Sequence, residues 1–389
     1  MNSTEITGRE EFDLRIKPIK IVMQVISLWP LKKDCSRYRI ILKIFHKLLI
    51  IVITSTLSVA GFLDSFRQLD NMDEASECAL IASAFALSTF RIAILSIHEK
   101  HLVHVVETMK SDWATFSYED RAFLKEKCDF HYRLAKYFIF SVAMPIFFFI
   151  AIPALELQLL GAERRWLPFR GHFFINATVS PVYESLYIYE IIGGVFGGSS
   201  IAAVTTFTLV TVTHGAARFA LVGRKLQSLK GDEPNAEELS TRYIKQHQDA
   251  IEFAGTLESA INVVALGQFL VSTGLVCFAG FQVTSMLEDK GRLMKYSAFL
   301  NSAILELFMF SFGGGELMDE SIAVADSAYD SGWTENAPYA KSMQIIMMRS
   351  RVPCTITAAK FYSMSLKSFQ AVLSTSFSYF TMLKAVDEK

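Results

Sequence analysis

A run of histidines is the first feature of this chain that could do chemistry. His98, His101 and His104 are followed by Glu107, and both residue types are common zinc ligands. The zinc hydrolase motif needs histidines at i and i+4 with a glutamate directly after the first, whereas position 102 is leucine. A spacing of three drifts around a helix. We therefore predict no metal site here, no cofactor and, because no nucleophile–base pair is recognisable, no enzyme.

Three glutamates lie within or near long apolar blocks: Glu156, Glu190 and Glu306. An acid inside a membrane is costly and often functional. For Glu156, near a block's end, we favour a neutral or hydrogen-bonded side chain; for the other two, a functional role and simple burial stay open. The paired glycines at 193–194 and 197–198 are followed by no lysine, so we interpret them as close helix packing or local bending.

The elements that must position these residues are transmembrane helices. The chain is 51% hydrophobic with 32 phenylalanines, and a crossing needs about 20 mostly apolar residues. The net charge of −1 indicates no polyanion partner, and we predict no nucleic-acid binding. We expect an all-α membrane protein with seven spans, the fourth too long for one crossing: Ile40–Leu63, Ala75–Ile97, Leu134–Leu157, Val182–Val212, Asn262–Leu287, Ser297–Gly314 and Ala358–Val386.

The distribution of Lys and Arg between the spans predicts the orientation. The segments 1–39, 98–136, 215–250 and 315–360 together hold 25 of them, and the alternate segments hold 9. We predict an intracellular N-terminus and an extracellular C-terminus, opposite to a G-protein-coupled receptor. Asn176, in the glycosylation triplet Asn-Ala-Thr, then falls on the outside.

The last predicted span is amphipathic in an unusual way. On a helical wheel one face carries small, hydroxylated and, at the outer end, apolar residues: Met364, Ser368, Ala371, Thr375, Ser378, Met382 and Val386. The opposite face is bulky: Tyr362, Leu366, Phe369, Leu373, Phe377 and Phe380. Hydroxyl groups are satisfied by a water-filled path or a neighbouring helix but not by lipid. Both a pore wall with a hydrophobic constriction and close helix packing fit this pattern.

The same region carries a family resemblance. The stretch Ala328-Tyr329-Asp330-Ser331-Gly332-Trp333 and the sequence from MMRSRVPC to TMLKAV resemble the C-terminal signature of insect odorant receptors. Ser27-Leu28-Trp29-Pro30 is similar to the family's Gly-x-Trp-Pro element, with serine in place of glycine, and Thr334 stands where an aromatic residue often follows the tryptophan.

The resemblance implies a tetrameric, ligand-gated cation channel whose last helix is split. The two parts would be a cytoplasmic anchor at about Ala337–Ser350 and a pore-lining part at Ala358–Val386, interrupted at Pro353. The family's gate falls on Met382 and Val386, with Ser378, Thr375, Ala371 and Ser368 lining the pore. The implied regions are 1–39 cytoplasmic, 40–314 transmembrane with the ligand pocket in the outer half, 315–357 the anchor region and 358–389 the pore helix and tail.

The resemblance also implies a subtype and partners. The family's co-receptor has a long insertion between the fourth and fifth spans, and this chain has a short connection around 229–234. It resembles an odour-specific subunit that forms a heterotetramer with the co-receptor in the plasma membrane of olfactory sensory neurons. The ending Ser378, Tyr379, Ala385, Val386 departs from that of gustatory receptors. A gustatory receptor channel and a G-protein-coupled-type chemoreceptor remain the alternatives, and no internal halves indicate a transporter.

A small volatile ligand needs an apolar cavity with a few polar groups, which the resemblance places among the second, third, fourth and sixth spans. Tyr183, Tyr187 and Ile191 share one helix face, and a tyrosine's polar tip suits oxygenated odorants. The candidates are Phe85, Ser88, Phe148, Phe149, Ile152, Tyr183, Tyr187, Ile191, Phe299, Ser302 and Glu306.

Overall fold

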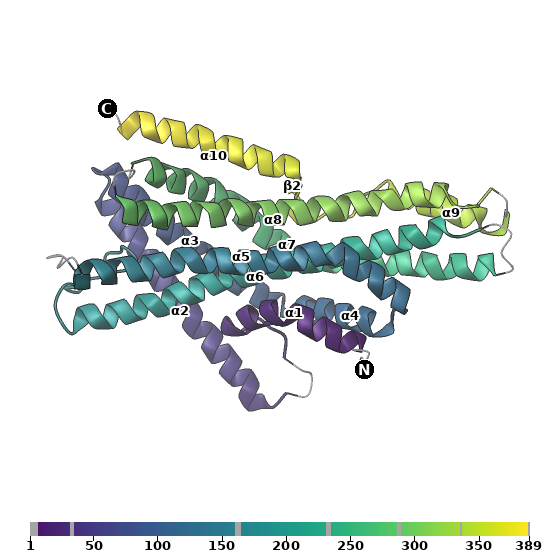
Figure 1. The fold of residues 1–389 in the computed structure, drawn as a ribbon, viewed down its shortest axis with the longest axis horizontal. Helices are drawn as coiled ribbons and strands as arrows, with labels where there is room; N and C mark the ends of the chain where they lie inside the picture. Colours follow the sequence, from purple (N-terminus) through teal and green to yellow (C-terminus); the bar gives the residue numbers. More distant parts are fainter. Residues whose placement is uncertain are drawn as a thin grey trace.

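The computed structural model describes residues 7–31, 35–159, 165–230, 235–285, 289–334 and 337–387. These residues form long helices and a single short hairpin (Figure 1). The elements are α1 (Gly8–Val25), α2 (Arg37–Arg67), α3 (Met72–Ile97), α4 (Glu99–Thr115), α5 (Tyr118–Leu159), α6 (Val182–Gln227), α7 (Ala236–Ser285), α8 (Lys290–Tyr329), α9 (Ala337–Ser350), β1 (Thr357–Ala358), β2 (Tyr362–Ser363) and α10 (Leu366–Asp387).

Six helices in the described part of the chain are long and apolar enough to cross a membrane: α2, α3, α5, α6, α7 and α8. Each contains one of the first six predicted spans, or nearly all of it. The helix α10, with 22 residues, is not among the six. A seventh span and the orientation of the termini remain predictions.

Four of these helices continue far beyond a bilayer. We expected the fourth span to project into water at one end, and α5, α7 and α8 are also longer than a crossing needs, with 42, 50 and 40 residues. At 1.5 Å per residue, α7 is about 75 Å long, against about 30 Å for the hydrocarbon core. The amphipathic helices α1, α4 and α9 pack beside these extensions (Figure 1).

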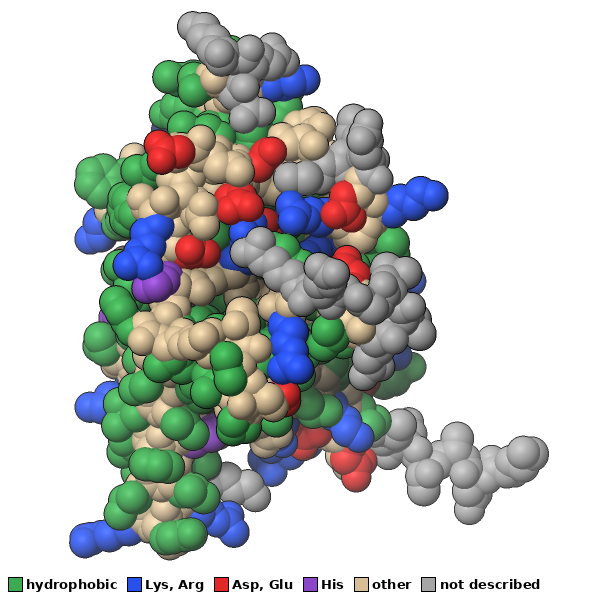
Figure 2. Space-filling model, turned by 90° about the vertical axis from the view of Figure 1, so that its left-hand side faces the viewer, with side chains coloured by type: hydrophobic (Ala, Val, Ile, Leu, Met, Phe, Trp, Pro, Cys, Tyr) green, Lys and Arg blue, Asp and Glu red, His purple; other side chains and the backbone are tan. Residues whose placement is uncertain are grey.

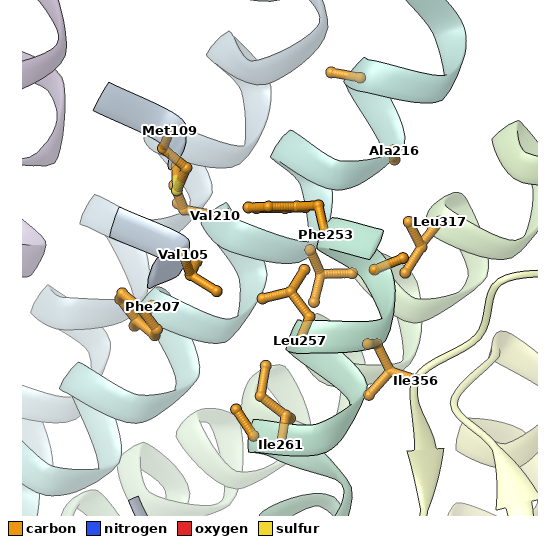
Figure 3. Packing of buried hydrophobic residues seen from close by; sticks show 14 of the residues in the cluster. Val105, Met109, Phe207, Val210, Ala216, Phe253, Leu257, Ile261, Leu317 and Ile356 are labelled. Atoms are coloured by element: carbon orange, nitrogen blue, oxygen red, sulfur yellow. The ribbon is translucent and has the colours of Figure 1, made fainter. Parts of the chain in front are cut away.

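A compact hydrophobic core forms where the extended helices meet α4. Val105 and Met109 of α4 lie beside Phe207 and Val210 of α6 and near Phe253 of α7 (Figure 3). The same cluster includes Leu257 and Ile261 of α7, Leu317 of α8 and Ile356, which lies just before β1 (Figure 3). This core ties the start of the hairpin, and hence α10, to the long helices.

The helix α6 lies at the centre of the bundle. Every residue from 202 to 217 is buried, as expected for a helix surrounded on all sides. Two of its threonine hydroxyls bond the helix's own carbonyls: Thr206 donates to Ala202 at 2.6 Å and Thr211 to Phe207 at 2.8 Å. These two polar side chains are therefore satisfied without water.

The segment after α9 differs from the predicted continuous helix. We expected a helix from Ala358, but residues 357–363 form the antiparallel pair β1–β2, and α10 begins at Leu366. Glu258 of α7 accepts the Thr357 backbone N–H at 2.7 Å, which holds this strand extended. Met364, expected on the polar face of the helix, is 1% exposed and packs against Gly314 of α8.

Candidate functional site

A cavity of about 80 Å³ lies between α3, α5, α6, α7 and α8. Its wall is almost entirely apolar, and one segment outside the helices contributes Phe169. The lining residues are Ile81, Ala84, Phe85, Leu87, Ser88, Val142, Pro145, Ile146, Phe149, Phe169, Gly194, Gly197, Gly198, Ile201, Leu275, Phe299, Ser302, Ala303 and Glu306. Pockets for drug-sized ligands usually measure several hundred Å³, so this cavity suits a small molecule.

Three glycines of α6 make room for the cavity's aromatic and aliphatic wall. A Cβ atom added to Gly194 would lie 2.7 Å from the ring of Phe169, and one on Gly197 would lie 2.9 Å from the ring of Phe85. At Gly198 it would lie 2.0 Å from Cδ1 of Ile146. The predicted close packing at these glycines is therefore present, and it also shapes the cavity.

An aromatic layer covers one side of the cavity. Phe169 contacts Phe85 edge-on at 5.2 Å and Phe149 at 5.5 Å between ring centroids, and Phe149 contacts Tyr296 at 5.7 Å. Glu190, fully buried, accepts the backbone N–H of Phe169 at 2.8 Å. Glu190 thus fixes the loop residue that closes the wall.

Charged side chains gather beyond this aromatic layer, on the end of the molecule that faces the viewer in Figure 2. Arg170 pairs with Glu74 at 3.1 Å and with Glu77 at 3.2 Å. Glu77 also accepts the hydroxyl hydrogen of Tyr296. This network joins the start of α3 to the start of α8 and to the loop that carries Phe169.

One residue of the cavity wall belongs to a buried ion pair. Glu306 of α8, 3% exposed, lies 2.7 Å from Nη2 of Arg91 in α3, which is fully buried. The hydroxyl of Thr205 in α6 donates to the same carboxylate oxygen at 2.9 Å. The guanidinium also lies 5.8 Å from the ring centre of Phe310. Three candidate membrane helices therefore meet at one compensated charge pair.

Two hydroxyl groups complete the polar part of the wall. Ser88 donates to the carbonyl of Gly197 at 3.2 Å, and Ser302 donates to that of Ser141 at 2.6 Å. Each serine hydroxyl oxygen also lies 3.0 Å from the carbonyl oxygen four residues earlier in its own helix. Their hydrogens are therefore used within the protein.

The structure brings together six of the eleven residues predicted to contact a ligand. Those lining the cavity are Phe85, Ser88, Phe149, Phe299, Ser302 and Glu306, and those outside it are Phe148, Ile152, Tyr183, Tyr187 and Ile191. The two tyrosines bond backbone carbonyls instead: Tyr183 donates to Trp166 at 3.0 Å and Tyr187 to Ile150 at 2.6 Å. Both share a helix face with Gly194 but precede it by two to three turns, about 10 to 16 Å. Ligand contact at Tyr183 and Tyr187 therefore stays a prediction, and these residues do not line this cavity.

The sequence reasoning missed Arg91 and Phe169. An arginine in an otherwise apolar span is a functional signal of the same kind as an acid, so Arg91 could have been found. Phe169 lies in a loop with no periodicity that could reveal its inward position.

The helix α10 rests on α7 and α8 by one face only. Val372 and Ser376 are buried, and Phe369 contacts Phe308 of α8 at 5.9 Å between ring centroids. The opposite face is exposed in this single chain, with Met382 at 68% and Val386 at 47%. Ala371, Thr375 and Ser378 are also exposed, whereas Ser368 is half-buried and bonds the carbonyl of Ser363 at 3.1 Å.

The histidine run spans a break between two helices. The helix α3 ends at Ile97 and α4 begins at Glu99, with His98 between them. Within the described ranges, no group of three or more His, Cys, Asp or Glu side chains is arranged to hold a metal.

The sequence matches the 7tm odorant receptor family over residues 71–377. Odorant receptor 10 of Aedes albopictus is 28% identical over 230 residues, which are 57% of this chain and 61% of that protein. Odorant receptor 13a of Drosophila melanogaster is 28% identical over 275 residues, 64% of this chain and 66% of that protein. The chain thus spans less than two thirds of the length of these curated relatives.

The fold is similar to that of a solved insect receptor. The structure of the olfactory receptor OR5 from Machilis hrabei in complex with eugenol superposes with a TM-score of 0.81, covering 97% of this chain and 100% of that one. The sequences are 17% identical, so this likeness establishes the fold alone.

Proposed function

The chain belongs to the insect odorant receptor family, and from this premise we propose that it is an odorant-gated, non-selective cation channel subunit. The observation that carries the proposal is the small apolar cavity among candidate membrane helices, with a single compensated carboxylate in its wall. Such a cavity holds a small volatile molecule by apolar contact and orients it by one polar group. In our proposal it lies in the outer half of the membrane.

The exposed face of α10 supports the pore assignment. Ala371, Thr375, Ser378, Met382 and Val386 point away from their own subunit. Around a symmetry axis, such faces would enclose a narrow path lined by small and hydroxylated residues. Met382 and Val386 at its outer end would form a hydrophobic constriction that conducts only when widened.

A contiguous set of contacts links the cavity to this helix. Leu275 of α7 lines the cavity, and five residues later the same helix reaches α10, where a Cβ added to Gly280 would lie 3.8 Å from the ring of Phe380. A ligand that binds the open arrangement better than the closed one shifts the population toward opening. A second contact runs through α8, where Glu306 lines the cavity and Phe308, two residues later, contacts Phe369 of α10.

We further propose that this chain is an odour-specific subunit in the plasma membrane of olfactory sensory neurons. The helix α6 ends at Gln227 and α7 begins at Ala236, so there is no room for the long insertion of the co-receptor. In this proposal, residues 315–357 anchor the heterotetramer with the co-receptor on the cytoplasmic side.

The test is a whole-cell current recording with an odorant panel, with and without the co-receptor. Ala84→Leu fills the cavity wall on α3 and is expected to lower the odorant response at least ~10-fold, because a ligand of this size loses its space. Ala86→Leu, on the same helix and also half-buried but outside the cavity, is the matched control. Equal effects of the two substitutions would contradict the assignment of the cavity.

The same cells test the orientation. An N-terminal epitope is expected to bind antibody only after permeabilisation. Labelling of intact cells, together with currents that need a G protein, would favour the G-protein-coupled alternative.

A further inference from the structure

Few polar groups face the cavity, and all of them are hydrogen-bond acceptors. Besides apolar side chains and glycines, the wall holds Ser88, Ser302 and Glu306. A hydroxyl group has one hydrogen to donate. Since both serines donate theirs to backbone carbonyls, only their oxygen lone pairs remain for a ligand.

Glu306 offers the strongest of these acceptors. Its Oε1 atom accepts the hydroxyl hydrogen of Thr205 and lies 2.7 Å from Nη2 of Arg91 as an ion pair. Its Oε2 atom has no hydrogen-bond partner among the residues that the structure describes. A carboxylate accepts and does not donate, so this oxygen can bond a cavity occupant only if the occupant supplies the hydrogen.

The charge balance narrows the class of donor. Arg91 already compensates Glu306 at 2.7 Å, so an ammonium ligand would add an unpaired positive charge to a buried apolar site. Arg91 is not part of the cavity wall and presents no N–H to the ligand. A neutral hydroxyl group fits both the charge and the hydrogen-bonding pattern.

We infer that the cavity selects small neutral molecules with one hydrogen-bond donor, namely alcohols and phenols, over isosteres that can only accept. The inference rests on the proposed function, because it names the ligand class of the same cavity. An aldehyde, ketone or ether leaves Oε2 unpaired and sets its own oxygen against a carboxylate and two acceptor hydroxyls. A site that bonds a ligand's hydroxyl hydrogen loses far more affinity for an analogue without that hydrogen than for an analogue that lacks one methylene group.

The first experiment measures binding to the purified full chain in lipid nanodiscs with matched sets of small ligands. Benzyl alcohol, benzaldehyde, toluene and benzylamine share one ring, and cyclohexanol, cyclohexanone and methylcyclohexane provide a second shape. We expect each alcohol to bind about 10 to 100 times more tightly than its carbonyl partner. Benzylammonium is expected to bind more weakly than benzyl alcohol.

The second experiment exchanges the acceptor for a donor without leaving a buried charge. Arg91→Met combined with Glu306→Gln gives a neutral pair whose amide NH₂ can face the ligand. The preference is then expected to reverse toward benzaldehyde. Glu320→Gln, on the exposed side of the same helix, is the control and keeps the preference for alcohols. The unfolding midpoint and surface labelling show whether the double variant folds, and the comparison on the unmodified chain decides the matter if it does not.

The outcomes separate this inference from the function on which it rests. Equal or tighter binding of the carbonyl compounds by the unmodified chain overturns the ligand class and leaves an odorant-binding chain. Binding of no compound in either set, by a chain that unfolds cooperatively, overturns both. Selective binding of alcohols without any current in cells supports the ligand class and contradicts the channel proposal.

Discussion

Removing one partner of the Arg91–Glu306 pair should damage the protein more than removing both. The pair lies 2.7 Å apart with the two residues 0% and 3% exposed, so each charge depends on the other. Taking away one charge and leaving the other buried costs about 3–5 kcal/mol, whereas replacing a whole buried pair with apolar residues of similar size is close to neutral. We therefore expect Glu306→Leu or Arg91→Met alone to lower the free energy of unfolding by about 3 kcal/mol or more.

The double variant, Arg91→Met with Glu306→Leu, should recover most of this loss. The measurement is a double-mutant cycle from reversible unfolding of the full chain in mixed micelles, followed by tryptophan fluorescence. Surface labelling in cells gives a second readout, since a loss of 3 kcal/mol multiplies the unfolded fraction by about 150.

The chain offers a matched control on the same helix. Lys127 and Glu320 lie 2.8 Å apart, but their side chains are 44% and 28% exposed. An exposed pair contributes at most about 1 kcal/mol, so Lys127→Met, Glu320→Leu and their combination should show little coupling. If the buried cycle is additive like this one, the charges at 91 and 306 do not hold each other and the reasoning is refuted.

Three further predictions concern function. In cells with the co-receptor, Met382→Ala should raise the basal current by widening the constriction. Phe377→Ala, equally exposed on another face of α10, should not raise it. If both variants leave the basal and evoked currents unchanged, Met382 is not part of the gate. Gly198→Ala should weaken odorant responses ~10-fold or more by pushing an isoleucine side chain into the cavity, whereas Gly255→Ala, with nothing within 4 Å of its Cβ, should leave the dose–response curve in place. Tyr187→Phe should cost about 1 kcal/mol of stability through its lost hydrogen bond and leave ligand affinity within about threefold, and a large loss of affinity would bring the ligand to the outer end of α6.

Much of the helix layout follows from apolar block lengths. The first six predicted spans lie in six long helices, because about 20 apolar residues in a row have few other solutions. The full lengths of α5, α7 and α8 could not be predicted from these apolar blocks. Beyond the membrane, these helices are stabilised by tertiary contacts such as those of Phe253 and Leu317, and the local pattern there is that of any amphipathic segment.

Only part of the cavity wall can be predicted from local sequence patterns, because the rest depends on contacts between distant segments. Phe85, Ser88 and Ser302, chosen from helix position and residue type, line the cavity, and their contact with a ligand stays a prediction. Tyr183 and Tyr187 share a helix face with Gly194 but lie two to three turns before it. The wall at Gly194 is closed by Phe169, and the position of Phe169 depends on a loop and on Glu190. The start of α10 was misjudged at Ala358 because a bond from a distant helix, at Glu258, keeps the strand extended.

The buried ion pair also affects how the chain inserts into the membrane while it is being synthesised. Ribosomes deliver α3, with its arginine, roughly two hundred residues before α8 brings the glutamate. At about 5–20 residues per second, the arginine waits on the order of 10 to 40 seconds for its counter-charge. A charged side chain in a membrane helix costs about 2.5 kcal/mol or more when it lies at the bilayer centre, so we expect the arginine to be sheltered during that interval in the translocon or against earlier helices. We therefore expect stable insertion of α3 to be completed only after α8, the sixth long apolar helix, has left the ribosome.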